Sequence, residues 1–183
     1  MLKKQILFRS GSGEPSAASG NLTAAIDLAQ LREYWELTKP RLSMLSVVTA
    51  VVGYLAANPA RDLSVLLSLL IGTSLAAGAC GALNQYLERE ADRQMARTRG
   101  RPIPSGAISP TAALIFGLVL GVSGTACIWL GANALAAGLT LATLVSYLLV
   151  YTPVKRISAW NTVIGAIPGA LPPLIGWAAA ANS

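Results

Sequence analysis

Three oxygen-bearing side chains recur at four-residue intervals near the end of a long apolar segment: Asn84, Glu88 and Asp92, called here the acidic stripe. On an α-helix this spacing puts all three on one face, each about one turn beyond the last. Amide and carboxylate oxygens are the ligands that hard cations such as Mg²⁺ prefer. We therefore predict that these residues are catalytic and hold a metal ion.

A basic segment follows the acidic stripe. Residues 97–106 read RTRGRPIPSG, in which prolines and glycines favour a loop. Arginine forks bind phosphate oxygens, and a metal ion neutralises the charge that builds up on a departing diphosphate. We predict that Arg93, Arg97 and Arg101 bind a lipid diphosphate. An apolar, water-poor interior would shelter the carbocation left behind.

Two other segments carry candidate residues. Tyr151 and Lys155 follow a later apolar segment, and Lys39 and Arg41 precede an early one. Tyr151 and Lys155 are predicted to be catalytic, the tyrosine by facing a cation or donating a hydrogen bond. Lys39, Arg41 and Lys155 are predicted to bind the diphosphate. Aromatic and basic residues also gather at the ends of spans for topology alone, and that interpretation stays open.

The composition indicates a membrane protein. The 183 residues are 54% hydrophobic and 12% charged, and a soluble domain carries about twice that charged fraction. No Asp, Glu, Lys or Arg occurs from 103 to 154 or from 157 to 183. The net charge of +6 lies in short segments between apolar stretches, which membrane topology explains, so we exclude a nucleic-acid partner. Histidine is absent, which excludes histidine-based catalysis and ligation within this sequence.

The apolar segments predict an all-α fold, an integral membrane helical bundle with five spans. Residues 1–21 are expected to form a flexible tail, and residues 22–41 the interfacial segment, in which an amphipathic helix over 22–37 is ended by residues 39–41. The transmembrane domain is expected over 42–183. Its spans are predicted at 42–57, 63–83, 111–130, 134–151 and 160–181, with the second helix continuing through Asp92.

The distribution of charge predicts the orientation of the bundle. The N-terminal segment, residues 84–110 and residues 152–159 hold thirteen of the fourteen basic residues. These three segments are therefore expected on the cytoplasmic side. The acidic stripe, the arginine loop and Lys155 would then face one another at the same membrane surface.

At these residues the chain resembles the UbiA-type membrane prenyltransferases. Their first motif is Asn-x-x-x-Asp-x-x-x-Asp, followed by an arginine-rich loop that ends in Arg-Pro-x-Pro-x-Gly. Asn84, Glu88 and Asp92 match the first part, with Glu88 in place of the commoner aspartate, and residues 99–106 match the second. Within the family, residues 36–41, 88–99 and 151–177 are similar to the protohaem IX farnesyltransferase branch.

The resemblance implies a specific reaction. Enzymes of that branch transfer a farnesyl group from farnesyl diphosphate to a vinyl group of haem B, giving haem O, in the inner membrane of bacteria. Mg²⁺ is the implied cofactor. Family members have about nine spans and a second acidic motif, so the five spans here are expected to be an N-terminal portion that is incomplete at its C-terminal end and inactive alone.

Other functions are considered beside this one. A different branch of the family would use an aromatic acceptor such as 4-hydroxybenzoate. CDP-alcohol phosphotransferases are also acid-rich membrane enzymes, but their motif has more closely ordered aspartates than residues 84–92. A transporter or a structural bundle would carry charges in mid-span. Here the charges cluster at one membrane edge, which disfavours that class.

Overall fold

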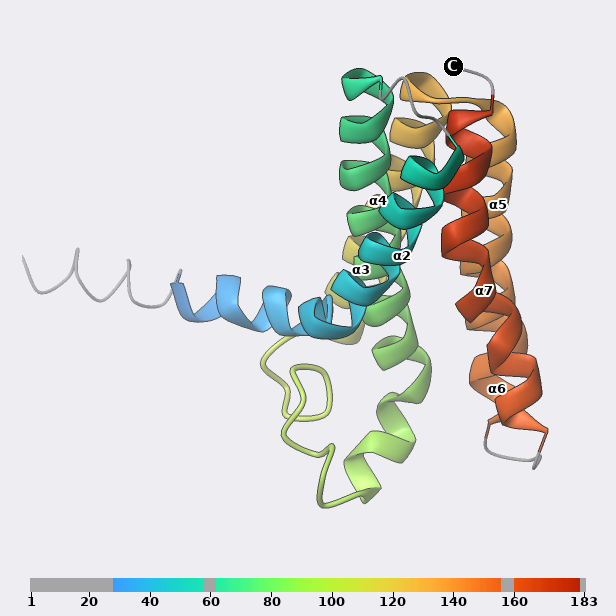
Figure 1. The fold of residues 1–183 in the computed structure, drawn as a ribbon. Helices are drawn as coiled ribbons and strands as arrows, with labels where there is room; N and C mark the ends of the chain where they lie inside the picture. Colours follow the sequence, from blue (N-terminus) through green and yellow to red (C-terminus); the bar gives the residue numbers. More distant parts are fainter. Residues whose placement is uncertain (1–27, 58–61, 156–159, 182–183) are drawn as a thin grey trace, which may run out of the picture.

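The computed structural model describes residues 28–57, 62–155 and 160–181, and within these ranges every regular element is a helix. Residues 28–37 form a first helix that projects sideways from a bundle (Figure 1). The bundle contains α2 (Pro40–Ala57), α3 (Leu63–Gln94), α4 (Pro110–Gly131), α5 (Ala134–Val145) and α7 (Asn161–Ala180). A π-helical segment, η1 (Ser146–Tyr151), and the short α6 (Thr152–Val154) prolong α5. The predicted tail at 1–21 lies outside the described residues.

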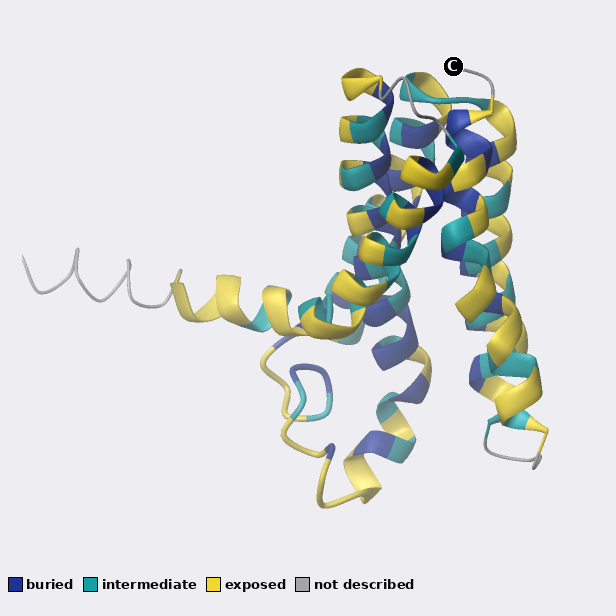
Figure 2. Ribbon diagram, viewed as in Figure 1, coloured by how far each residue is buried: buried dark blue, intermediate teal, exposed yellow. Residues whose placement is uncertain are grey.

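Five helices are long and apolar enough to cross a membrane: Pro40–Ala57, Leu63–Gln94, Pro110–Gly131, Ala134–Val154 and Asn161–Ala180. Large hydrophobic side chains such as Leu45, Val122 and Leu149 are exposed. Figure 2 shows exposed positions along the outer faces of the helices. Helices that are apolar on the outside as well as the inside suit a lipid surrounding. The predicted five-span helical bundle is confirmed.

Small residues let the helices approach closely. α3 packs along α4 and α2 along α7. A Cβ atom added at Gly124 would lie 2.7 Å from the Gly72 carbonyl oxygen, and one added at Gly53 would clash with the Pro173 backbone. Such contacts between backbones replace bulky side-chain packing in membrane bundles.

The length of α3 brings the acidic stripe to the edge of the bundle. Its 32 residues begin at an Asp62 N-cap, whose carboxylate accepts hydrogen bonds from the Ser64 and Val65 amides. At 1.5 Å per residue the helix is about 48 Å long, whereas the hydrocarbon core of a bilayer is about 30 Å thick. The last turns of α3 therefore extend beyond the core, as the sequence predicted (Figure 1).

Of the interfacial segment expected over 22–41, the structure describes residues 28–41, and the helix in it ends before residues 39–41, where the sequence predicted its end. The helix over 28–37 ends at Leu37, and α2 begins at Pro40. Lys39 between them has a φ of 49°, in the left-handed region that cannot continue a helix. Leu37 is fully buried against Ala82 and Ile103, which fixes the junction on α3 and on the loop after it.

Candidate functional site

The acidic stripe lies on one face of α3 and is buried. Asn84, Glu88 and Asp92 are 1%, 6% and 4% exposed, respectively. The Asn84 amide nitrogen donates to Glu88 Oε2 at 2.8 Å, which ties two members of the stripe together. Buried carboxylates need counter-charges or hydrogen bonds, because desolvation disfavours the charged form. The surrounding elements supply both.

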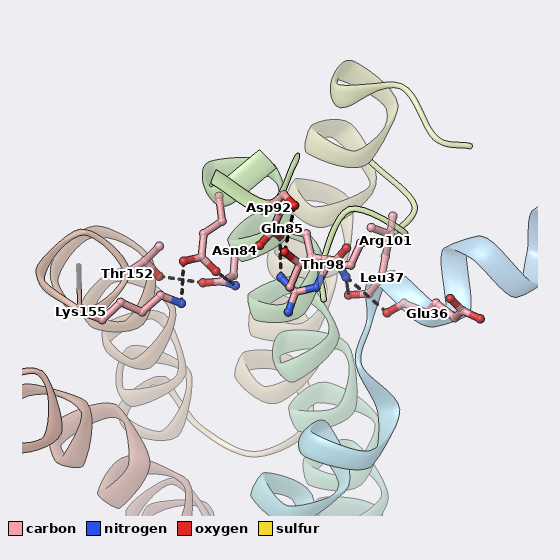
Figure 3. Close-up of polar contacts among 10 residues, drawn as sticks. Glu36, Leu37, Asn84, Gln85, Asp92, Thr98, Arg101, Thr152 and Lys155 are labelled. Atoms are coloured by element: carbon pink, nitrogen blue, oxygen red, sulfur yellow. Dashed lines mark hydrogen bonds and ion pairs between the residues drawn. The ribbon is translucent and has the colours of Figure 1, made fainter. Parts of the chain in front are cut away.

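One counter-charge comes from the end of the fourth span. Lys155 Nζ lies 2.7 Å from Glu88 Oε1, just beyond α6. The Thr152 hydroxyl lies 3.0 Å from Asn84 Oδ1 and 2.9 Å from the Tyr147 carbonyl oxygen. Figure 3 shows Thr152 and Lys155 reaching toward α3 from the same side. The π-helical turn of η1 precedes these residues, and such turns often occur at functional sites.

The other counter-charge comes from the arginine loop. Arg101 Nη1 lies 2.6 Å from Asp92 Oδ2. The Thr98 hydroxyl donates to the Asp92 carbonyl oxygen at 2.9 Å, which folds the loop back onto the end of α3. Arg101 and Lys155 therefore approach the stripe from two loops, one on each side (Figure 3).

Two cavities adjoin this cluster. The larger one, called here the apolar chamber, has a volume of about 750 Å³ and lies between α2, α3, α5 and α7. Tyr147, Tyr151 and Cys80 are among its lining residues. The smaller, called here the basic pocket, has a volume of about 490 Å³ and is lined in part by Gln85, Arg97 and Arg101. The acidic stripe lines neither cavity, because its side chains are covered by their partners.

Lys39 borders both cavities. Burial and the positive charge of Arg101 lower the pKa of Lys39 to about 8, against an ordinary value of 10.5. The carboxylates of Glu88 and Asp92 oppose this shift. A cation held in a partly desolvated place beside other cations is poised to receive an anion.

Two of the predicted diphosphate ligands lie elsewhere in the structure. Arg93 pairs with Glu90 at 3.6 Å, outside the stripe. Arg41 is exposed and lines neither cavity. Arg97 lines the basic pocket although it is exposed. The structure thus gathers Lys39, Arg101 and Lys155 around the stripe, places Arg97 at the basic pocket and leaves Arg41 and Arg93 at the periphery.

Several residues of the site were not predicted from the sequence. Thr98, Thr152, Gln85 and Tyr147 contact the cluster or line its cavities. The Tyr147 ring lies 5.4 Å from that of Tyr151, and Lys155 Nζ lies 5.7 Å from the Tyr151 ring centroid. The four-residue spacing of Tyr147 and Tyr151 was a usable signal, since it places both on one helix face.

The donor set suits a divalent cation that is shared with a substrate. The described residues contain no group of three His, Cys, Asp or Glu side chains able to hold a metal without help. Mg²⁺ in proteins is commonly bound by one or two carboxylates together with substrate phosphates. Glu88 and Asp92, with the Asn84 amide oxygen, fit that pattern, because their present partners are cations that a phosphate also attracts.

Comparison with known proteins identifies the class. The profile of the UbiA prenyltransferase family matches residues 46–183, so the chain belongs to the UbiA prenyltransferase family. Together with the five candidate spans, this makes it a multi-pass membrane protein. A solved structure titled as work on digeranylgeranylglyceryl phosphate synthase superposes with a TM-score of 0.73. The two chains are 24% identical over 84% of this chain and 55% of the other, which shows a common fold.

Curated relatives point to one branch of the family. A protein from Opitutus terrae named protoheme IX farnesyltransferase is 52% identical over 151 residues, 82% of this chain and 51% of that protein. One of the same name from Solibacter usitatus is 48% identical over 162 residues, 83% of this chain and 56% of its own. The chain thus spans about half the length of the curated relatives it matches.

Proposed function

We propose that the protein acts in transferring a farnesyl group from farnesyl diphosphate to a vinyl group of haem B, giving haem O. One observation carries the proposal: a buried acidic stripe, bridged by cations from two loops, adjoins an apolar chamber of about 750 Å³. The names of the curated relatives support the choice of acceptor. They favour haem over 4-hydroxybenzoate.

The proposed reaction breaks the bond between the farnesyl C1 atom and the diphosphate oxygen. Pyrophosphate leaves with the bonding electron pair, and C1 forms a new bond to the terminal vinyl carbon of haem. The positive charge that this leaves on the haem side chain is quenched by water, which supplies the hydroxyl group and releases a proton. Water that reached the farnesyl cation first would give farnesol, so water must arrive only after the carbon–carbon bond has formed.

The residues of the chain have distinct parts in this scheme. Lys39, Arg97, Arg101 and Lys155 bind phosphate oxygens, which neutralises charge on the leaving group. Tyr147 and Tyr151 line the chamber, where their ring faces stabilise a developing cation. The apolar walls around them exclude water from that cation.

Glu88, Asp92 and the Asn84 amide oxygen would hold the divalent metal, which we propose to be Mg²⁺. When bound, the metal supplies charge neutralisation at the diphosphate. Lys155 and Arg101 are free to turn from the carboxylates to the phosphates as the site fills, because a phosphate offers them more charge than one carboxylate.

The inner membrane of a bacterial cell is the proposed location, with the acidic stripe, the arginine loop and the end of α6 on the cytoplasmic side. The concentration of basic residues in these segments supports this orientation. Cysteine substitutions in the loop 95–109, probed with a membrane-impermeant reagent from either side of sealed vesicles, would test it. Labelling from the periplasmic side alone would refute it.

The test of the function is a product assay. The whole coding sequence of the gene is expressed in bacterial membranes that lack a haem-farnesylating enzyme, and haems are extracted and analysed by mass spectrometry. Haem O is expected when farnesyl diphosphate and Mg²⁺ are supplied. Farnesylated 4-hydroxybenzoate in a parallel reaction, with no change in the haem pool, would overturn the proposal.

A further inference from the structure

The chain bends at Lys39, between the helix over 28–37 and α2 (Figure 1). Lys39 has a φ of 49°, the conformation that glycine usually supplies just after a helix. Its amide nitrogen donates to the Glu36 carbonyl oxygen at 3.2 Å, and the Thr38 hydroxyl donates to the Trp35 carbonyl oxygen at 2.8 Å. A lysine in this backbone conformation is uncommon, so surrounding contacts must hold it there.

We call the bend at residues 37–39 the elbow. Two residues of α3, one turn apart, form the surface on which it lies, called here the seat: Gly81 and Gln85. A Cβ atom added at Gly81 would lie 2.8 Å from the Leu37 carbonyl oxygen and 2.9 Å from the Thr38 carbonyl carbon. Only glycine therefore lets the elbow lie against the helix. One turn further on, Gln85 contacts the same segment and is 2% exposed.

The Gln85 amide caps the end of the first helix. Its nitrogen donates to the carbonyl oxygens of Glu36 and Leu37, each at 3.4 Å. Carbonyls in the last turn of a helix have no partner within the helix. The Glu36 carbonyl oxygen also accepts from the Lys39 amide, whereas Gln85 supplies the donor for the Leu37 carbonyl oxygen. The amide orientation follows from this, because an oxygen in that place would face two other oxygens.

The elbow places Lys39 where the two cavities meet. Lys39 and Leu42 are the lining residues that the apolar chamber and the basic pocket share. The charged groups that act on Lys39 come from α3, the arginine loop and the end of α6: Glu88, Asp92, Arg101 and Lys155. Lys39 is thus the described cation that borders both the charged side and the apolar side of the site.

We propose that Gly81 and Gln85 are positioning residues, which hold the elbow so that the Lys39 ammonium meets the bound substrate at the junction between its diphosphate and its prenyl chain. The inference rests on the proposed function. Lys39 contacts the substrate in this account, and Gly81 and Gln85 act through Lys39, although Gly81 also lines the apolar chamber and Gln85 the basic pocket. An effect of Gln85 that passes through Lys39 must vanish when Lys39 is replaced by a neutral side chain, whereas a direct contact of Gln85 with the anion would persist.

Gln85→Leu is a suitable test variant. It removes two long hydrogen bonds, but it also removes Oε1, a buried atom with no hydrogen-bond partner among the described residues. Removal of this unsatisfied acceptor offsets much of the stability that is lost with the two hydrogen bonds, so the variant is expected to fold. Gln94→Leu is a matched control, because Gln94 lies on the same helix and is exposed.

The experiment is a thermodynamic cycle on the purified chain in detergent, with farnesyl diphosphate, inorganic pyrophosphate and farnesol as separate probes. Gln85→Leu is expected to weaken farnesyl diphosphate binding about tenfold, with farnesol binding unchanged. In a Lys39→Gln background the same substitution should have no further effect, and Lys39→Arg should keep most of the affinity. Independent effects of the two substitutions would overturn the inference, as would an equal effect of Gln94→Leu.

A second measurement needs no ligand and separates this inference from the proposed function. Competitive acylation of amines, followed by peptide mass mapping, reports how accessible each lysine is. In the Gln85→Leu protein Lys39 should react several-fold faster while Lys155 is unchanged. Unchanged labelling of Lys39 would refute the positioning role of Gln85, even if the protein binds farnesyl diphosphate. Faster labelling in a protein that binds no diphosphate would support the positioning role and refute the proposed function.

Discussion

Lys155 Nζ lies 2.7 Å from Glu88 Oε1, and this ion pair joins the end of the fourth span to the acidic stripe on α3. The carboxylate side chain is 8% exposed and the lysine side chain 26%, so the pair is partly desolvated. It closes one flank of the site before any ligand arrives. The arrangement explains why a basic residue far away in the sequence belongs to the same site as the stripe.

Removal of one partner of this ion pair should lower the stability of the protein more than removal of both partners. Lys155→Met leaves the Glu88 carboxylate buried without its nearest counter-charge, and we expect a loss of about 1–2 kcal/mol in stability. The double variant Lys155→Met, Glu88→Gln should recover most of it. Thermal unfolding in detergent measures both. A double variant that loses the sum of the two single effects would show that the pair is not coupled.

Arg101 and Arg89 provide a matched comparison of two arginines. Arg101 reaches Asp92 and lines the basic pocket, whereas Arg89 pairs with Glu90 at 3.4 Å and covers the Tyr86 ring. Arg101→Gln should weaken pyrophosphate binding about tenfold or more, and Arg89→Gln should change it less than about twofold. Isothermal titration with pyrophosphate and Mg²⁺ measures the difference. Equal losses would place the anion outside the basic pocket.

The lowered pKa of Lys39 predicts a pH dependence of binding. In the free protein the pKa is about 8, because of burial and the nearby Arg101 charge, and a bound diphosphate favours the ammonium form and raises it. Binding above pH 8 therefore takes up a proton, and the affinity should fall about fivefold from pH 8 to pH 9. The Lys39→Arg side chain stays charged over this pH range, so this variant should lack the fall in affinity that comes from Lys39. Any pH dependence that comes from ionisation of the diphosphate itself is the same in both proteins. An identical slope in both proteins would contradict the assignment.

Two glycines on α7 test the chamber as a binding site. A Cβ atom at Gly165 would lie 2.7 Å from the Tyr151 ring, whereas one at Gly169 meets no atom within 4 Å and enters the chamber. Gly165→Ala should cost about 1–3 kcal/mol, and Gly169→Ala should not destabilise the protein. Gly169→Leu should weaken farnesyl diphosphate binding more than pyrophosphate binding. Equal weakening of both ligands would show that the prenyl chain binds elsewhere.

The spans and the acidic stripe were predictable because they depend on local periodicity. Long uncharged segments predicted the bundle, and the four-residue spacing of Asn84, Glu88 and Asp92 predicted one helix face. The continuation of α3 through Asp92 followed from the same pattern. The implied Mg²⁺ site and the roles of the individual residues remain predictions.

The elbow and the partners of the arginines depend on tertiary contacts and were not predictable. The end of the first helix near residues 39–41 was predictable from the proline, but the left-handed conformation of Lys39 leaves no signal in composition. Arg93 and Arg101 look alike in the sequence, but Glu90 lies one turn from Arg93 and pairs with it. Nothing in the sequence distinguishes Gln85 from other polar residues, because the carbonyl groups to which it donates belong to Glu36 and Leu37, far away along the chain.

The most direct test of the account is the dependence of farnesyl diphosphate binding on Mg²⁺ and on the acidic stripe. The purified chain is titrated with farnesyl diphosphate in Mg²⁺ and in EDTA, together with Asp92→Asn and with Gln94→Leu as the control. The account predicts binding that requires Mg²⁺, that weakens at least about tenfold in Asp92→Asn and that is unchanged in Gln94→Leu. Equal affinity in EDTA, or in Asp92→Asn, would contradict it.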